Sequence, residues 1–236
     1  MSRFITNIRK KSVQNEQSDG ISVAILSAGC GSKIKSYEPR SLLKTGNGQS
    51  IIDQQLDTIG NFFVKPEIIT VVGCYANKII KKIKGKCRIV ENQIYEETNS
   101  SESMRLALNN STMLNFMFIH GDIVFDYNCL NVEYNNSFII VDSKKMIKDS
   151  EIGVTIVNDK VSIMSYGLPI KWAQIAFFTG KELKILNNIF QRFEEKDRKK
   201  LSFEIINEVI ANGGVFNCYE PSKMKIKEID TIKDIE

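Results

Sequence analysis

The sequence predicts an α/β fold in which a mostly parallel central sheet carries helices on both faces, with an added smaller β region in the second half. Short apolar, β-branched runs alternate regularly with amphipathic helical segments through the first half of the chain. Consecutive parallel strands are joined by right-handed helical crossovers, so this alternation covers both faces of a sheet. The second half contains closely spaced short strands, which are typical of hairpins.

The alternation can be followed element by element from the N-terminus. Residues 21–26 (ISVAIL) form an apolar run that ends in glycine, which is typical of a buried parallel strand. In residues 50–62, isoleucine and leucine recur at helical spacing. Further strands are predicted at residues 68–72, 88–90 and 116–119, and further helices at residues 77–83 and 101–108.

The second half is predicted to contain mainly strands, followed by two helices and a strand near the C-terminus. Asn158 and Asp159 are predicted to form a hairpin turn, and Gly213 and Gly214 to end a helix. The strands are expected at residues 137–141, 152–157, 160–164, 175–178 and 225–230, and the helices at residues 183–195, 203–212 and from 231 onward.

Length and composition limit the classes of protein to consider. A chain of 236 residues with 42% hydrophobic and 25% charged residues suits one globular domain, assigned to residues 21–236, behind a flexible polar tail at residues 1–20. Half of the net charge of +4 lies in that tail, so no extended nucleic-acid surface is expected. No apolar run in the sequence is long enough to predict a membrane span. Five separated cysteines without a signal peptide predict reduced thiols in a cytoplasmic protein.

The segment at residues 26–43 carries the strongest chemical signal. A strand enters a loop rich in small residues, where backbone N–H groups can close around an anion or a base. Gly29 and Gly31 permit close approach, while Lys33 and Arg40 supply positive charge where a triphosphate would lie. The spacing matches neither a P-loop nor a dinucleotide-binding fingerprint. A glycine turn with incidental basic residues is therefore an equal alternative on these residues alone.

This loop resembles the signature of the nucleoside triphosphate transferases, roughly L-x-A-G-x-G-x-R followed by P-K-x-L. The matching residues are Leu26, Ala28, Gly29, Gly31, Pro39 and Leu42. Lys33 stands where the family usually has arginine and Arg40 where it has lysine, so both positions keep their charge. The resemblance implies a Rossmann-like fold, and nucleotide binding by Leu26, Ser27, Ala28, Gly29, Gly31 and Ser32.

The resemblance extends to two aspartates from opposite ends of the chain. Asp122, in the sequence H-G-D, matches the family's metal-binding aspartate, and Asp230, in E-I-D-T-I-K-D, matches the aspartate that completes a magnesium site. Magnesium usually takes only one or two protein carboxylates and fills its octahedral shell with phosphate and water oxygens. By itself, either aspartate could instead cap a turn or a helix.

A looser similarity connects residues 91–104 with the phosphocholine-type cytidylyltransferases. It rests on Asn92, Tyr95, Asn99 and Ser103, and it implies nucleotide binding by Asn92, Asn99 and Ser103. Amide and hydroxyl groups offer both donors and acceptors to a base or a ribose. A polar loop that caps the following helix is an equal alternative.

The activity implied by the resemblance is magnesium-dependent nucleotidyl transfer. A substrate phosphate would attack the α-phosphorus of a nucleoside triphosphate, while Lys33 and Arg40 neutralise the departing pyrophosphate. The first choice of donor is CTP, and the first choice of acceptor is a small phosphorylated alcohol or amine. Such a reaction would supply precursors of cell-surface polysaccharides or lipids. The runner-up is a hexose-1-phosphate nucleotidyltransferase that uses UTP, dTTP or GTP, and a molybdopterin guanylyltransferase comes third.

Two alternatives come from other classes of protein. One is a glycosyltransferase of related fold, although the D-x-D motif typical of its metal site does not occur at Asp122. The other is a non-catalytic nucleotide-binding protein. The expected partners are a nucleoside triphosphate and a small phosphorylated substrate, without nucleic acid or membrane, and assembly into a homo-oligomer is left open.

Overall fold

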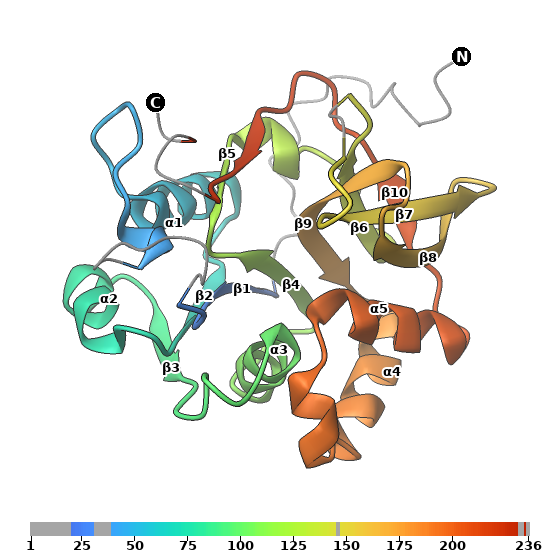
Figure 1. Cartoon of the computed structure of the whole chain (residues 1–236), viewed down its shortest axis with the longest axis horizontal. Helices are drawn as coiled ribbons and strands as arrows, with labels where there is room; N and C mark the ends of the chain where they lie inside the picture. The colour runs from blue at the N-terminus through green and yellow to red at the C-terminus, as the bar shows by residue number, and fades with distance from the viewer. Residues whose placement is uncertain (1–19, 31–38, 145–146, 231–233, 235–236) are drawn as a thin grey trace.

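A computed structural model describes residues 20–30, 39–144, 147–230 and 234 (Figure 1). In these residues, nine strands form one sheet in the order β3-β2-β1-β4-β9-β6-β10-β8-β7. In chain order they are β1 (Ile21–Ser27), β2 (Glu67–Val72), β3 (Arg88–Glu91), β4 (Asn115–His120), β6 (Phe138–Asp142), β7 (Ile152–Val157), β8 (Lys160–Tyr166), β9 (Ile170–Phe178) and β10 (Asn217–Tyr219). A separate two-stranded sheet pairs β5 (Ile123–Phe125) with β11 (Ile226–Glu228).

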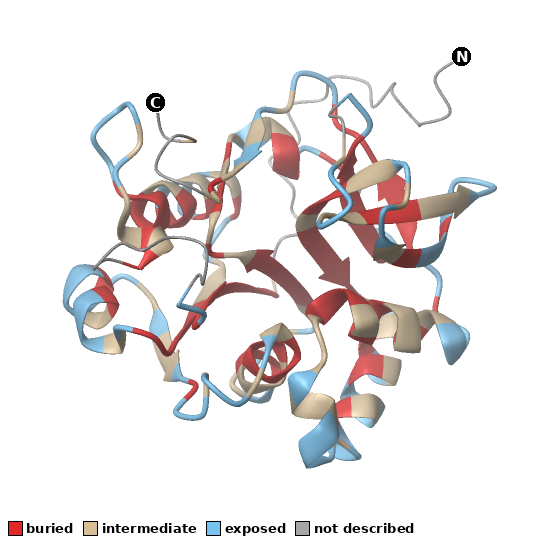
Figure 2. Ribbon diagram, in the orientation of Figure 1, coloured by how far each residue is buried: buried red, intermediate tan, exposed pale blue. Residues whose placement is uncertain are grey.

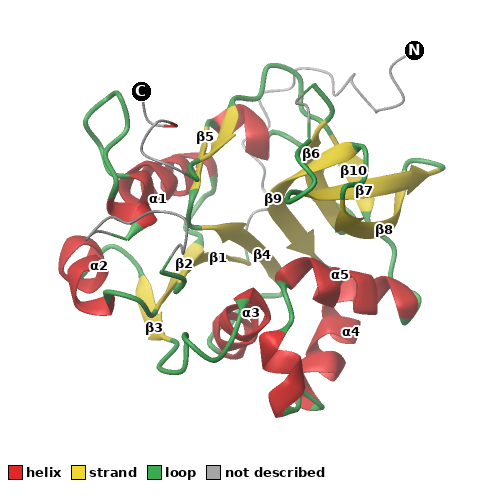
Figure 3. Cartoon of the chain, in the orientation of Figure 1, coloured by secondary structure: helices red, strands yellow, loops and turns green. Residues whose placement is uncertain are grey.

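Helices cover both faces of the sheet, as the view coloured by secondary structure shows (Figure 3). One hydrophobic core lies under α1 (Ile51–Phe62), α2 (Ala76–Ile83) and the 3-10 helix η3 (Tyr127–Leu130). The other core lies under α3 (Ser100–Asn109), α4 (Gly180–Gln191) and α5 (Ser202–Ala211). The strands between them are largely buried (Figure 2). Two further 3-10 helices are η2 (Arg40–Leu42) and η4 (Glu195–Lys199).

The α/β class is confirmed, and the predicted parallel pairing holds for the first four strands. β1 pairs in parallel with both β2 and β4, and β2 pairs in parallel with β3. Every residue of β1 is buried, as expected for a continuous apolar run in a sheet covered on both faces. α1 begins after Ser50, whose side chain accepts a hydrogen bond from the backbone N–H of Asp53.

The predicted mostly parallel sheet does not extend into the second half, where the added β region is largely antiparallel. Its strands continue the same sheet, and β9 is antiparallel to β4, β6 and β7. β8 is antiparallel to β7 and β10, whereas β6 and β10 are parallel. The strands β9, β6, β10, β8 and β7 therefore close on themselves. Apolar patterning reveals a strand but does not name its neighbour, which is why the sequence did not predict this closure.

Most predicted boundaries lie within a few residues of the observed ones, but β9 begins at Ile170, five residues before its predicted start. The hairpin turn is present, since Asn158 and Asp159 join β7 to β8 with positive φ values of 51° and 61°. The three-residue strands β5 and β10 were not predicted, whereas β11, also of three residues, lies within the strand predicted at residues 225–230. Apart from Gly20, the predicted tail is outside the described residues, and so are 231–233 of the expected final helix. The single-domain assignment of residues 21–236 stays a prediction.

Within the described ranges, no helix combines the length and the apolar character that crossing a bilayer requires.

The register of the parallel strands sets the carboxyl ends of β1 and β4 side by side. Leu26 aligns with His120, and the backbone N–H of Gly121 donates to the Leu26 carbonyl at 2.9 Å. A Cβ at Gly121 would overlap the Ser27 hydroxyl and lie 2.9 Å from the Leu26 carbonyl oxygen. The glycine therefore permits the close approach of the two chain segments that follow these strands.

Candidate functional site

A cavity of about 330 Å³ opens at the carboxyl ends of β1 and β4. Its wall is formed by the end of β1, the segment around η2, the loop between β3 and α3 and the turn after β4. Open α/β sheets bind ligands at this edge. The predicted site residues that line it are Leu26, Ser27, Ala28, Gly29, Arg40, Asn92, Asn99, Ser103 and Asp122.

The glycine-rich loop is described only at its two ends. Gly31, Ser32 and Lys33 fall among the residues that the structure does not describe. Ser27 and Ser41 line the cavity on either side of this gap, and no described residue pairs with their buried hydroxyl oxygens. A buried hydroxyl without a protein partner is costly, so these two hydroxyls are available to bind water or a polar ligand in the cavity.

The structure brings together the two predicted metal ligands, Asp122 and Asp230. Asp122 follows β4, and Asp230 follows β11, whose pairing with β5 returns the C-terminal segment to this edge. The backbone N–H of Ile229 donates to the Asp122 carbonyl at 2.8 Å. The Nη1 atom of Arg40 donates to Asp122 Oδ2 at 2.8 Å and lies 3.5 Å from Asp230 Oδ1.

The donor set of these carboxylates fits one hard divalent cation. Asp122 Oδ1 is buried and has no partner among the described residues, so it can still accept a ligand. The described part of the chain contains no cluster of three or more His, Cys, Asp or Glu side chains suited to a metal. Magnesium needs no such cluster, because it commonly combines one or two carboxylates with phosphate and water oxygens. A cation shared with a phosphorylated ligand matches this arrangement.

The loop between β3 and α3 contributes polar residues whose side chains are already hydrogen-bonded within the protein. Asn92 is buried, and its Nδ2 donates to Thr98 Oγ1 at 3.0 Å while its Oδ1 accepts from a backbone N–H two residues further on. Asn99 precedes α3, but its side chain donates to the Lys199 carbonyl at 3.2 Å and does not cap the helix. Asn92 thus shapes the loop, and Ser103 adds a hydroxyl-bearing side chain to the lining.

Several residues of the wall were not among the predicted site residues. Tyr95 matched the looser family pattern without being assigned, whereas Leu201 comes from the segment before α5 and no local pattern marks it. The unpredicted lining residues are Pro39, Ser41, Tyr95, Thr98, Ser100, His120, Gly121 and Leu201. Asp126, a further carboxylate four residues after Asp122, does not line this cavity; its side chain accepts a hydrogen bond from the Lys225 backbone N–H.

His120 lies at the boundary between this cavity and a second one. Its Nε2 is 2.9 Å from the Ser202 hydroxyl, and its ring contacts Phe118 and Trp172. Burial lowers the pKa of His120 below its ordinary value, although the charge of Asp122 acts in the opposite direction. A neutral imidazole in this position serves as a packed and hydrogen-bonded part of the wall.

The second cavity, of about 180 Å³, shares His120 and Asp122 with the first. Lys171 lines it and is ion-paired with both Glu151 and Glu228, with 3.1 Å between its Nζ and Glu228 Oε2. Burial alone would lower the pKa of Lys171, but these two carboxylates raise it above its ordinary value. Lys171 is therefore a charged ammonium that is ion-paired with Glu151 and Glu228.

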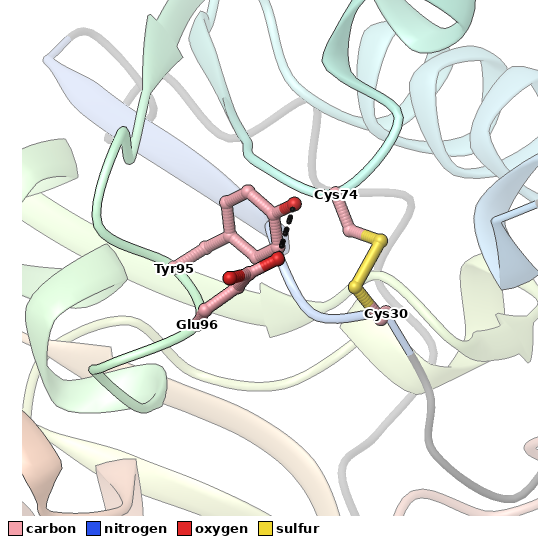
Figure 4. The surroundings of a disulfide bond; sticks show 4 residues. All are labelled: Cys30, Cys74, Tyr95 and Glu96. Carbon is pink, nitrogen blue, oxygen red and sulfur yellow. Dashed lines mark hydrogen bonds between the residues drawn. A yellow bond between two sulfur atoms is a disulfide. The ribbon is translucent and has the colours of Figure 1, made fainter.

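The prediction of reduced thiols is wrong for two of the five cysteines. Cys30, in the glycine-rich loop, forms a disulfide with Cys74, which follows β2 (Figure 4). β1 and β2 are parallel neighbours, so the residues just beyond their carboxyl ends come within bonding reach despite a sequence separation of 44. The backbone N–H of Cys74 also donates to the Ala28 carbonyl at 2.9 Å. The described free cysteines are Cys87, Cys129 and Cys218.

No family model matches the chain, and no curated protein matches it by sequence. The fold is similar to that of solved nucleotidyltransferases. The inositol-1-phosphate CTP transferase from T. maritima superposes with a TM-score of 0.72 at 14% identity, covering 91% of each chain. The CTP:phosphocholine cytidylyltransferase from Streptococcus pneumoniae gives a TM-score of 0.74 at 18% identity, covering 91% of this chain and 96% of its own.

A nucleoside-diphosphate-sugar pyrophosphorylase from Vibrio cholerae gives a TM-score of 0.69 at 12% identity, covering 91% of this chain and 97% of its own. At these identities, the likeness establishes the fold that the chain shares with these enzymes.

Proposed function

We propose that this protein is a nucleotidyltransferase that transfers NMP from a nucleoside triphosphate, with CTP favoured, to a small phosphorylated substrate and releases pyrophosphate. The observation that carries the proposal is the meeting of Asp122, Asp230 and Arg40 beside a cavity at the strand ends. A pair of carboxylates and a guanidinium suits a metal-bound triphosphate. The fold shared with known nucleotidyltransferases supports the same reading.

The first cavity is proposed to bind the nucleotide. Residues at the end of β1 would approach it with backbone N–H groups, and the unpartnered hydroxyls of Ser27 and Ser41 would bind its polar groups. Arg40 would bind the phosphates, with Lys33 assigned to the same task by the family resemblance. The remaining nucleotide-binding residues are proposed to be Leu26, Ala28, Gly29, Gly31, Ser32, Asn92, Asn99 and Ser103.

Magnesium is the proposed cofactor, and Asp122 and Asp230 would hold it. The unpartnered Oδ1 of Asp122 supports this assignment, because a carboxylate oxygen is buried there without a donor. When bound, magnesium supplies neutralisation of charge on the phosphate oxygens. The side chains contribute positioning, since the nucleophile is an already ionised substrate phosphate that needs no general base.

The second cavity is proposed to bind the phosphorylated acceptor. It adjoins the first at Asp122, so a substrate in it would lie next to the phosphates of a nucleotide in the first. The preference for CTP and a small acceptor is supported by two structural neighbours, which are named as enzymes that use CTP with inositol-1-phosphate or phosphocholine.

Hexose-1-phosphate is the second candidate acceptor, with UTP, dTTP or GTP as donor. The sugar pyrophosphorylase and a putative glucose-1-phosphate thymidylyltransferase from Bacillus anthracis, with a TM-score of 0.71 and 13% identity, support this alternative.

A pyrophosphate-release assay tests the proposal. Each of the four nucleoside triphosphates is combined with phosphocholine, inositol-1-phosphate or glucose-1-phosphate, in magnesium or in EDTA. We expect magnesium-dependent release with CTP and one of the first two acceptors, and a loss of about 100-fold or more in Asp122→Asn. Asp57→Asn is the matched control, because Asp57 is exposed on α1. Full activity in Asp122→Asn, or no turnover with any combination, would overturn the proposal.

A further inference from the structure

Arg40 occupies the position of a counter-cation between the two candidate metal ligands. Its Nη1 lies 2.8 Å from Asp122 Oδ2 and 3.5 Å from Asp230 Oδ1, so one nitrogen serves both carboxylates. The three side chains are 15%, 22% and 21% exposed, respectively, and solvent therefore screens their charges only in part. The guanidinium thus lies where an added cation would have to act.

The charges explain why this contact matters for metal binding. Two carboxylates held this close repel one another, and a cation between them offsets that repulsion. A divalent ion that arrives without a nucleotide must displace Arg40 from the two carboxylates. The mostly buried guanidinium would then lose its partners, which costs free energy. Magnesium also gives up its hydration water reluctantly. Both effects weaken the binding of the metal by itself.

A nucleoside triphosphate changes this balance because it is an alternative partner for Arg40. The guanidinium presents five donors in a fixed fork that suits phosphate oxygens, and its Nε is buried without a partner in the described residues. When phosphates take over the guanidinium, Arg40 no longer competes with a cation for Asp122 and Asp230. The same phosphates also contribute oxygens to that cation.

We propose that Arg40 couples metal binding to nucleotide binding, so that the carboxylate pair accepts a divalent cation readily only together with a nucleoside triphosphate. This inference rests on the proposed function, because it assigns the cavity to a nucleotide. It makes Arg40 a positioning residue for the metal ligands as well as a phosphate ligand. It also gives Arg40 a role beyond phosphate binding at a position where the family signature has lysine, since its Nη1 contacts both carboxylates.

The binding of Mn²⁺ alone, measured from the electron paramagnetic resonance signal of the free ion, tests this coupling directly. We compare wild type, Arg40→Ala and Arg40→Lys, each checked for folding by circular dichroism. Arg40→Ala is expected to bind Mn²⁺ at least about tenfold more tightly than wild type. Adding Asp122→Asn to Arg40→Ala should abolish that gain, which locates the ion at the carboxylate pair.

Arg88→Ala is the matched control. Arg88 lies on β3 at the edge of the sheet, and its Nη2 is 3.0 Å from Glu67 Oε1. Its replacement removes the same charge away from the carboxylate pair and should leave the Mn²⁺ affinity at the wild-type value. Arg40→Lys retains one charge at the site and should give an affinity between those of wild type and Arg40→Ala.

A separate titration with Mn²⁺ and a non-hydrolysable α,β-methylene analogue of CTP distinguishes this inference from the proposed function. Equal Mn²⁺ affinity in wild type and Arg40→Ala, with the analogue still bound, would overturn the coupling and leave the proposed function standing. Failure of wild type to bind the analogue, or any other nucleoside triphosphate, in the presence of metal would overturn the proposed function and the coupling with it.

Discussion

Replacing Cys74 by serine removes the crosslink between the loop after β1 and the turn after β2 (Figure 4). The two half-cystines are separated by 44 residues, and the chain-entropy model for a loop of that length gives a loss of about 4 kcal/mol in the free energy of unfolding. In a chain of this size, 1 kcal/mol corresponds to about 2–4 °C, so the melting temperature should fall by about 8–16 °C.

Thermal unfolding followed by circular dichroism, with and without dithiothreitol, measures this loss. Wild type in dithiothreitol should melt close to Cys74→Ser, whereas Cys74→Ser itself should not respond to the reductant. Cys87→Ser is the control, because Cys87 is a free thiol and should leave the reductant effect intact. The reasoning is refuted if Cys74→Ser melts within about 2 °C of oxidised wild type, or if dithiothreitol shifts both proteins equally.

Three further predictions concern stability and the acceptor. Burial alone would raise the pKa of Asp53, but hydrogen bonds from two lysines and a serine lower it to about 2. The stability that this carboxylate contributes is therefore present above its ordinary pKa of 3.8 and is lost as the pH falls toward 2. The free energies of unfolding of wild type and Asp53→Asn, measured in urea, should therefore become equal as the pH approaches 2. Gly121→Ala should lower the free energy of unfolding in urea by about 1–3 kcal/mol, because the added Cβ overlaps the end of β1. Its control is Gly60→Ala in α1, where the Cβ meets open space, and this change should raise the free energy of unfolding by up to about 1 kcal/mol. Lys171→Met should raise the KM for the acceptor and leave the KM for CTP unchanged in steady-state kinetics. The substitution removes the ion pairs of Lys171 with Glu151 and Glu228 in the second cavity, where the acceptor is proposed to bind. An equal rise in both KM values would contradict the assignment of that cavity.

The elements with clear periodicity were predictable from the sequence, and the closure of the sheet was not. The apolar run of β1 and the helical spacing in α1 depend on residues that are neighbours in the sequence, so their patterns were visible there. The pairing of β7 with β9 and the insertion of β10 beside β6 depend on contacts between distant segments. No periodicity records such a contact.

The candidate site shows the same division between local and distant information. The family signature selected the loop after β1, Asp122 and Asp230, and the fold brings the described members of that set to one edge of the sheet. The role of Arg40 as a partner of both aspartates, and the crosslink of Cys30 to Cys74, arise only from the folded geometry. Leu201 enters the cavity from a distant segment and carried no signal in the sequence.

The most direct test of the nucleotidyltransferase assignment is the stoichiometry of its two products. Reaction mixtures with CTP, magnesium and the preferred acceptor are analysed by mass spectrometry for the CMP-linked product and by an enzymatic assay for pyrophosphate. The account predicts equal amounts of both products in wild type, and neither above background in Asp122→Asn. Pyrophosphate without a CMP-linked product, or equal yields from wild type and Asp122→Asn, would contradict it.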